Sequence, residues 1–407
     1  VAWRDIAASV CFATWGLYVL PASVAAEPVL RVAASAVELP VAVECPAAVD
    51  AACTWQLTLD GSAMSVPVQF GAAPSADGSP AAGRQRLMAV LPAGGEASVS
   101  RRFQLAPASA AWPAHFTFRD VAPESLQLCE GESPVFVYNH GVITRQDIPQ
   151  QEHRRSRSCY IHPLYGLSGE VLTDDFPADH YHHHGIFWTW PHVLVDGQAH
   201  DLWAGSTIAQ KFHRYLARET GPVSAVLAVE NGWYVGEELV MVERIWVRVF
   251  RAAAGARAMD MELYFTPVKP LSLQGAEGKS YGGLTVRFAP GAREETLITV
   301  PSGPAADDLP DTRLTWADFT SRFGQREHRS GAAILVSPRH PDYPPAWLTR
   351  YYGAMCVGFP GVEARAFEAG QPFRLDYRLW IHGQAAEFGR LQEVYTGYLQ
   401  ATDTQLE

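Results

Sequence analysis

The stretch Phe373-Arg-Leu-Asp-Tyr-Arg-Leu-Trp-Ile-His382 places an apolar residue at every second position. Alternate side chains of a β-strand point to opposite faces, so this period of two predicts a strand with one buried face. The same alternation occurs in Met259-Asp-Met-Glu-Leu-Tyr-Phe-Thr266, and a longer run of the same kind extends from Glu238 to Phe250. These stretches predict a fold built on long strands.

Between these runs the chain has Gly, Pro and Asp loops without helical patterns, which indicates large antiparallel sheets packed face to face. Residues 27–124 are rich in Ala, Val, Ser and Pro, with short extended runs, and predict a small β-sandwich. Residues 125–407 would form a second, larger domain, because 407 residues suit two cores better than one. The predicted fold class is therefore mostly β.

One helical pattern stands out, between Ala385 and Gln400 near the end of the sequence. Apolar and aromatic residues recur there at helical spacing, at Phe388, Leu391, Val394, Tyr395 and Tyr398. We expect a C-terminal helix that covers a sheet edge.

The first 26 residues resemble a secretory signal peptide. Arg4 precedes an apolar stretch from Ile6 to Leu20, and Pro21 and several small residues lead up to Glu27. An uncleaved membrane anchor is the alternative, but Pro21 and the small residues favour cleavage. No later segment is long and apolar enough to cross a bilayer. We therefore expect a periplasmic or secreted protein without membrane insertion after signal removal.

Export affects how the cysteines are interpreted, because disulfides persist in oxidising compartments. Five cysteines follow the signal peptide, and only Cys45 and Cys53 lie near each other. We predict a local disulfide between these two residues. The net charge of −11 comes without a long basic run, so nucleic acid is not an expected partner.

Histidines are concentrated in one part of the chain, where nine of the 14 lie between His153 and His213. At the centre of this part is Asp179-His-Tyr-His-His-His-Gly185. If this segment is extended, its even-numbered histidines point to one face, and Asp179 and His183 point to the other.

Three interpretations of the cluster remain open. The imidazoles can hydrogen-bond to the backbone in a polar loop. A histidine beside an aspartate can act as a general acid or base near neutral pH. Histidines spaced by two can also bind a divalent metal together with a carboxylate, and the candidate ligands are His180, His182 and His183. No H-E-x-x-H motif fixes a ligand set.

The residues around the cluster favour a binding site over a solvated loop. Arg157, Tyr160 and His162 precede it, and Trp188 and Trp203 follow it. Aromatic faces beside imidazoles, carboxylates and an arginine suit sugar rings, whose CH groups stack on the aromatic rings and whose hydroxyls meet charged acceptors. The sequence therefore predicts a saccharide or another small molecule as the ligand.

Four stretches of the chain together resemble the bacterial PmoA-like family, often labelled methane oxygenase. They are Val137-Tyr-Asn-His-Gly141, Arg157-Ser-Cys-Tyr-Ile-His-Pro-Leu-Tyr-Gly166, Asp179-His-Tyr-His-His-His-Gly-Ile-Phe-Trp188 and Gly278-Lys-Ser-Tyr-Gly-Gly-Leu-Thr-Val-Arg287. The resemblance covers about residues 126–382 and implies an exported bacterial protein. It also implies a large domain similar to the galactose-mutarotase or polysaccharide-lyase β-supersandwich. The label does not describe an activity of this chain, because the monooxygenase subunit that it names is an integral membrane protein.

The leading hypothesis is a carbohydrate-active enzyme that acts as a lyase, an epimerase or a hydrolase. An imidazole or Tyr281 would move a proton, and Lys279 or Arg157 would bind a carboxylate or stabilise negative charge. The candidate catalytic residues are His162, Asp179, His180, His182, His183, Lys279 and Tyr281. The candidate substrate-binding residues are Arg157, Tyr160, Trp188, Trp203 and His184.

Two other functions remain open. A metal-dependent oxidoreductase would use the same histidines as ligands, and a non-catalytic glycan-binding or envelope-structural protein would bind a saccharide without turnover.

Lys279 is far from the histidines along the chain, between glycines that permit tight turns. We predict that it meets His162, His180, His182 and His183 in one pocket with Asp179.

Overall fold

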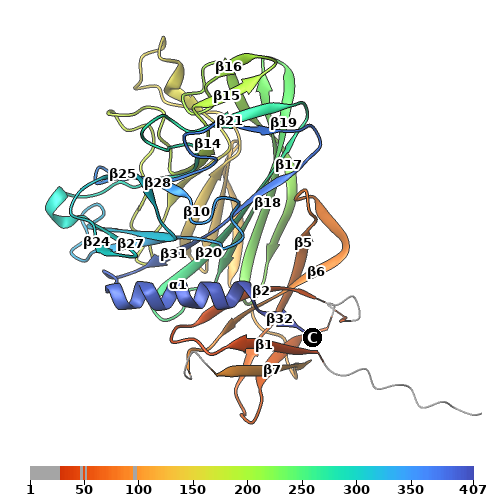
Figure 1. The fold of residues 1–407 in the computed structure, drawn as a ribbon. Helices are drawn as coiled ribbons and strands as arrows, with labels where there is room; N and C mark the ends of the chain where they lie inside the picture. The colour runs from red at the N-terminus through yellow and green to blue at the C-terminus, as the bar shows by residue number, and fades with distance from the viewer. Residues whose placement is uncertain (1–27, 46–48, 51–52, 95–98) are drawn as a thin grey trace, which may run out of the picture.

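The computed structural model describes residues 28–45, 49–50, 53–94 and 99–407 (Figure 1). Strands dominate these residues and pair antiparallel in every sheet of the described chain. The predicted mostly β fold is therefore confirmed. The predicted signal peptide, residues 1–26, lies outside the described residues.

Two large sheets form the body of the protein and pack face to face. The first sheet contains, in spatial order, β25 (Leu309–Arg313), β28 (Ala346–Arg350), β29 (Ala354–Gly358), β22 (Gly283–Arg287), β14 (Ile186–Thr189), β13 (Tyr160–Leu164), β10 (Ser133–Asn139), β9 (Ser125–Glu130) and β8 (Phe116–Ala122). The second contains β17 (Ile208–Thr220), β18 (Ser224–Val235), β19 (Glu238–Phe250), β20 (Ala256–Pro267), β31 (Phe373–His382), β27 (Ser330–Val336), β26 (Trp316–Ser321), β23 (Leu297–Val300) and β24 (Gly303–Pro304). Ile186 and Val286 of the first sheet share one core with Met259 and Leu375 of the second.

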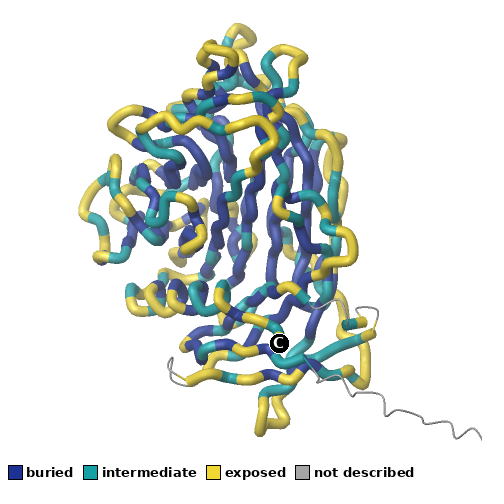
Figure 2. Tube along the Cα trace, turned by 45° about the vertical axis from the view of Figure 1, so that its right-hand side comes forward, coloured by how far each residue is buried: buried dark blue, intermediate teal, exposed yellow. Residues whose placement is uncertain are grey.

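Smaller sheets complete the fold. A four-stranded sheet contains β16 (Gln198–His200), β15 (His192–Val195), β21 (Leu271–Gln274) and β30 (Arg365–Phe367), and a two-stranded sheet pairs β11 (Ile143–Thr144) with β12 (Ser156–Arg157). Single 3-10 turns lie at η1 (His153–Arg155) and η2 (Arg293–Glu295). Buried residues follow the strands, and exposed residues gather in the connecting loops (Figure 2).

The alternation predicted for β20 and β31 is present, and the two strands are neighbours with Met261 opposite Tyr377. Their apolar side chains face the core between the large sheets. The opposite face differs from our expectation, because Asp376 and Arg378 on it are buried as well. Arg378 donates to the carbonyl of Pro40 in the N-terminal region at 3.1 Å, so that region covers the polar face of the sheet.

The predicted C-terminal helix is confirmed as α1 (Phe388–Thr402). Its residues Leu391 and Val394 pack against Trp316 of β26 and Leu335 of β27. Both strands lie inside the second large sheet, so α1 covers a face of that sheet (Figure 1) and not the edge that we expected.

The N-terminal region forms a small β-sandwich around its own core, which includes Leu30, Val41 and Leu87. One of its sheets contains β32 (Gln405–Leu406), β1 (Val29–Ala33), β7 (Ser100–Pro107), β3 (Trp55–Leu59) and β4 (Ser65–Pro67). The other contains β2 (Leu39–Cys45), β6 (Pro80–Leu91) and β5 (Gln69–Pro74). The C-terminal strand β32 thus returns to this sandwich. The division at residues 124 and 125 stays a prediction, and β8 before it pairs with β9 after it.

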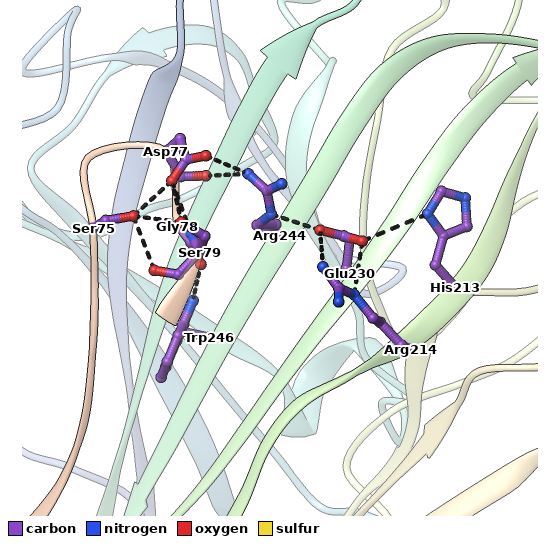
Figure 3. A network of polar contacts seen from close by, with 9 residues as sticks. All are labelled: Ser75, Asp77, Gly78, Ser79, His213, Arg214, Glu230, Arg244 and Trp246. Atoms are coloured by element: carbon purple, nitrogen blue, oxygen red, sulfur yellow. Dashed lines mark hydrogen bonds and ion pairs between the residues drawn. The ribbon is translucent and has the colours of Figure 1, made fainter. Parts of the chain in front are cut away.

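A polar network attaches the sandwich to the second large sheet (Figure 3). The turn between β5 and β6 places the Asp77 carboxylate 2.8 Å from Arg244 of β19. The Gly78 carbonyl accepts a 2.7 Å hydrogen bond from the indole of Trp246. Arg244 also donates to Glu230 of β18 at 2.8 Å, which links the turn to two strands of the sheet.

The predicted disulfide between Cys45 and Cys53 is not formed in the structure. Instead, the thiol of Cys53 donates to the Asp50 carboxylate at 3.3 Å. In the described residues, no helix is long and apolar enough to cross a membrane.

Candidate active site

A pocket of about 240 Å³ lies where the histidine-rich segment meets the loop before β22 and the β28–β29 hairpin. We refer to it as the histidine pocket. Its walls are formed by His180, His182, His183, Trp203, Lys279, Tyr281, Leu348, Arg350, Tyr352, Ala354 and Cys356. The predicted candidates His180, His182, His183, Trp203, Lys279 and Tyr281 thus come together, and their chemical roles stay predictions.

The histidine-rich segment is a series of turns and not the extended strand whose faces we had assigned. The amide of His180 donates to the Pro177 carbonyl and that of His183 to the His180 carbonyl, both at 2.9 Å. Because the chain turns, neighbouring side chains do not alternate between two faces. His182 and His183 can therefore both reach the pocket.

The rings of this segment form a compact aromatic stack. The His180 ring is nearly parallel to those of His183 and Tyr352, with centroids 4.6 and 5.2 Å away and interplanar angles of 5° and 11°, and the latter two rings lie 6.4 Å apart. The His182 ring meets His183 edge-on at 4.7 Å, and Trp203 lies 5.8 Å from His183. The stack restricts the orientation of each imidazole before any ligand binds.

Arg287 contacts two rings of this stack and the neighbouring carboxylate of Asp179. Its guanidinium donates to both carboxylate oxygens of Asp179, at 3.0 and 3.1 Å, and lies 4.7 Å from the ring centroid of Tyr352. The same group lies 3.4 Å from Nδ1 of His183. A guanidinium has only donors, so Nδ1 of His183 accepts and the proton of this imidazole is on Nε2.

Burial determines the charge of the pocket histidines. It lowers the pKa of His182 to about 4 and the pKa of His183 well below its ordinary value, and nearby cationic groups add to both effects. Both imidazoles are therefore neutral at pH 7. Burial raises the pKa of Asp179, but its contacts with His180 and Arg287 outweigh burial and lower that pKa overall. Asp179 is accordingly an ionised carboxylate.

A second polar group surrounds Asp175 and contains three predicted site residues that do not line the histidine pocket. Tyr160 donates to Asp175 at 3.0 Å, and Nδ1 of His184 lies 2.9 Å from its other oxygen. His162 contacts the Thr173 hydroxyl through Nδ1 at 3.1 Å. Burial raises the pKa of Asp175 to about 6, and burial lowers the pKa of both histidines.

Arg157 and Trp188 also lie away from the pocket, contrary to their predicted role in binding substrate. Arg157 is buried and donates to the Leu202 carbonyl at 3.0 Å and to Gln210 at 2.8 Å. Trp188 is fully buried in the core between the large sheets. Both side chains are therefore enclosed in the protein and do not line the histidine pocket.

Sequence reasoning missed Arg287, Arg350 and Tyr352. Arg287 ends the last of the four stretches that resemble the PmoA-like family, which was the only signal for it. Arg350 and Tyr352 come from the β28–β29 hairpin, which pairing with β22 brings to the site. Arg350 also pairs with Asp308 at 3.0 Å.

Two features limit the chemistry that the pocket can perform. Within the described part of the chain, no group of three His, Cys, Asp or Glu side chains is placed so that it could hold a metal ion. None of the described residues that line the pocket carries a carboxylate. The groups available are the neutral imidazoles of His182 and His183, the His180 ring, phenols, the Cys356 thiol and two cations.

Comparison with known proteins places the chain in a family without assigning it an activity. No curated protein matches the sequence. Similar solved structures include a candidate kojibiose phosphorylase from the human microbiome, with 6% identity, TM-score 0.31 and coverage of 69% of this chain and 32% of that one. The GH36 α-galactosidase from Geobacillus stearothermophilus, in complex with raffinose, has 10% identity, TM-score 0.32 and coverage of 71% and 42%.

Galactose 1-epimerase from Lactobacillus acidophilus NCFM is also similar, with 8% identity, TM-score 0.30 and coverage of 67% of this chain and 100% of that one. The chain thus spans less than half the length of the phosphorylase and the galactosidase. Such distant likenesses concern the fold and not the activity. In sequence, residues 125–396 match a family described as "Family of unknown function (DUF6807)". The chain therefore belongs to the DUF6807 family.

Proposed function

We propose that the protein is a carbohydrate-active enzyme that transfers a proton on a saccharide bound in the histidine pocket. The observation that carries this proposal is the pair of neutral imidazoles, His182 and His183, in the wall of a pocket that also contains Lys279 and Tyr281. An unprotonated imidazole can accept a proton, and a cation beside it can stabilise the negative charge that develops on the substrate.

The two imidazoles would have different roles. Nδ1 of His182 is buried and has no hydrogen-bond partner among the described residues, so this imidazole is available as a general base after a small side-chain rotation. Nδ1 of His183 faces the Arg287 guanidinium, which leaves Nε2–H as a donor to a substrate oxygen. Arg287 and Asp179 are then positioning residues for His183.

Lys279 would bind a carboxylate of the substrate. It is exposed at the mouth of the pocket, and no ion pair to it is found among the described residues. A carboxylate beside a ring carbon acidifies the hydrogen on that carbon, and its negative charge increases when the hydrogen is removed. Lys279 and Arg350 can stabilise that charge, and the largely buried Trp203 forms part of the pocket wall.

These groups favour a lyase or an epimerase over a hydrolase. Hydrolysis of a glycosidic bond commonly uses two carboxylates on opposite sides of the bond. The described residues that line this pocket include no Asp or Glu, whereas they include bases, cations and the Tyr281 phenol. Burial raises the pKa of Tyr281, which keeps its proton available for a leaving group.

The proposal includes export and the resemblance to PmoA-like proteins. Three of the four stretches that carry the resemblance contribute the strands β10, β13 and β22, and the fourth leads into β14. These four strands are consecutive neighbours in the first large sheet. The resemblance is therefore concentrated in one region, beside the histidine pocket.

The test is turnover of uronate-containing polysaccharides by the purified protein, measured by mass spectrometry of the products. We expect a product with unsaturated or inverted uronate residues, and its loss in the His182→Gln variant. His192→Gln is the matched control, because His192 is exposed on β15 outside the pocket. Binding of a saccharide without turnover would contradict the proposal and favour a glycan-binding protein. Turnover that requires an added divalent metal would favour the metal-dependent alternative.

A further inference from the structure

A second cavity, of about 420 Å³, lies on the other side of the second large sheet. It is lined by the strands β2, β6 and β32 of the sandwich, by the outer faces of β19, β20 and β31, and by the end of α1, and it is open to solvent on one side. We call it the arginine cavity, because five arginines line it: Arg86, Arg248, Arg374, Arg378 and the exposed Arg339. It shares no lining residue with the histidine pocket.

The carboxylates of the arginine cavity are all paired. Glu262 contacts Arg86, and it lies 3.1 Å from Arg374. Asp376 lies 2.5 Å from Arg374, and Asp260 lies 2.5 Å from Arg378. Each carboxylate therefore has a close guanidinium other than that of Arg248.

The cavity contains more positive than negative charge. Four guanidinium groups face three carboxylates, Asp260, Glu262 and Asp376, which leaves one positive charge. Glu44 and Arg339 also line the cavity, but both are exposed, Glu44 contacts Arg84, and solvent screens these charges. A buried charge is costly unless an opposite charge or hydrogen bonds compensate it, so the surplus requires an anion.

Arg248 is the residue that carries the surplus. Its side chain is 3% exposed, and it reaches Glu262 and Asp260 only at 3.4 and 3.7 Å. Its Nε is buried and has no hydrogen-bond partner among the described residues. The Arg248 guanidinium therefore has donors that its protein contacts do not use, and an oxyanion in the cavity can accept hydrogen bonds from its terminal nitrogens.

We infer that the arginine cavity binds an oxyanion through Arg248, and that its ligand is a sugar-sized molecule with one carboxylate. A guanidinium matches the geometry of a carboxylate and can donate two parallel hydrogen bonds to it. The volume lies within the range of about 300–1,000 Å³ that is typical of small-molecule sites, and it exceeds the needs of an inorganic ion. The site is separate from the histidine pocket and does not depend on its proposed activity.

The test measures thermal stability of the full chain with D-glucuronate, D-glucose or sulfate, each at the ionic strength of a sodium chloride reference. A ligand at about 100 times its Kd should raise the melting temperature by about 3 °C for a chain of this size. We expect this rise with glucuronate and not with glucose. An equal rise with sulfate that requires Arg248 would assign the oxyanion site to an inorganic anion, and the inference of a sugar-sized ligand would be overturned.

The Arg248→Met variant separates this cavity from every other site. It removes the surplus charge and leaves each of the three carboxylates with a close arginine, so we expect it to fold. Glucuronate that binds in the histidine pocket would still raise the melting temperature of Arg248→Met. Binding in the arginine cavity is therefore measured by the part of the glucuronate-dependent rise that this variant loses. Arg214→Gln, at an exposed arginine of β17, is the control and should keep the full rise.

A full glucuronate-dependent rise in Arg248→Met would overturn the inference, as would the absence of any rise in the unchanged protein. If Arg248→Met does not fold, Arg248→Lys keeps the charge but loses the planar guanidinium. We then expect glucuronate affinity to fall at least 10-fold, and an unchanged affinity would equally overturn the inference.

Discussion

His182 and His183 are adjacent in sequence but differ in how their protons are held. The contact with Arg287 fixes the tautomer of His183, whereas no described residue bonds Nδ1 of His182. Burial keeps both imidazoles neutral at pH 7. In the proposed reaction, His182 is therefore the general base, and His183 donates a hydrogen bond to a substrate oxygen.

His182→Gln should lower kcat/KM roughly 100-fold or more, the usual contribution of a general base. In the unchanged protein, kcat/KM should stay constant from neutral pH down to about 5 and fall through an apparent pKa of about 4, because protonation of His182 removes the base. Initial rates from pH 3.5 to 8 measure this profile. An acid limb at the ordinary histidine pKa of 6.5 would contradict the assignment.

Asp175 gives a prediction about stability. Its pKa rises from 3.8 to about 6 on folding because the carboxyl is buried. The folded carboxyl holds its proton more tightly than the unfolded one. The group therefore contributes stability below pH 3.8, and that stability is lost as the pH rises through about 6. A pKa shift of this size corresponds to a loss of about 3 kcal/mol.

The Asp175→Asn variant lacks this titration. The difference in unfolding free energy, unchanged protein minus variant, should therefore be about 2 kcal/mol larger at pH 4 than at pH 7, because the unfolded carboxyl is already partly ionised at pH 4. Urea denaturation at the two pH values measures it. A difference that is constant, or that grows toward pH 7, would show that Asp175 is not destabilised by burial.

The loop at residues 275–282 brings Lys279 and Tyr281 to the pocket, and its end is constrained by Gly283. Gly283 has φ +118°, and an added Cβ would lie 2.6 Å from the Val357 carbonyl of the neighbouring strand β29. The first residue of β22 must therefore be glycine if β22 and β29 are to pair closely.

Gly283→Ala should shift the loop and lower kcat/KM about 10- to 100-fold, since a displacement of about 1 Å can have that effect. Gly303→Ala is the matched control, with φ +112° and no atom within 4 Å of the added Cβ. Steady-state kinetics and melting temperatures of both variants give the comparison. Equal losses in the two variants would mean that backbone strain alone is responsible.

Local sequence patterns predicted the elements better than the site. The alternation in β20 and β31 and the stripe of α1 could be recognised, because each depends on residues close together in the chain. The turn at His180 to His184 could not, since hydrogen bonds such as that from His183 to His180 replace the strand. Arg287 was missed as a site residue because its partner Asp179 is brought to it only by the pairing of β14 with β22.

The arrangement of the sandwich on the large sheet explains why the polar face of β31 is buried. Sequence alternation could not reveal this, because Asp376 and Arg378 look like solvent-facing residues until the sandwich covers them. The turn at Asp77 and Gly78 fixes this contact (Figure 3). Gly78 is close to the Tyr264 ring, where an added Cβ would lie 2.6 Å from Cγ.

Gly78→Ala should therefore destabilise the contact between the sandwich and the sheet. Gly61→Ala is the matched control, because Gly61 has φ +73° against +81° at Gly78 and no atom within 4 Å of an added Cβ. We expect Gly78→Ala to cost about 1–3 kcal/mol more than Gly61→Ala, the usual range for overpacking. Calorimetric melting of both variants measures it, and equal losses would contradict a tight contact at Tyr264.

Proton transfer on a saccharide carbon can be observed directly by exchange with solvent. The purified protein is incubated in D₂O with a uronate-containing polysaccharide, and the uronate residues are analysed by mass spectrometry. An epimerase of the proposed kind incorporates one deuteron at the ring carbon beside the carboxylate, and a lyase loses that hydrogen as it forms a double bond. We predict one of these outcomes for the unchanged protein and for His192→Gln, and neither for His182→Gln. Turnover that leaves this hydrogen in place would contradict proton abstraction in the histidine pocket.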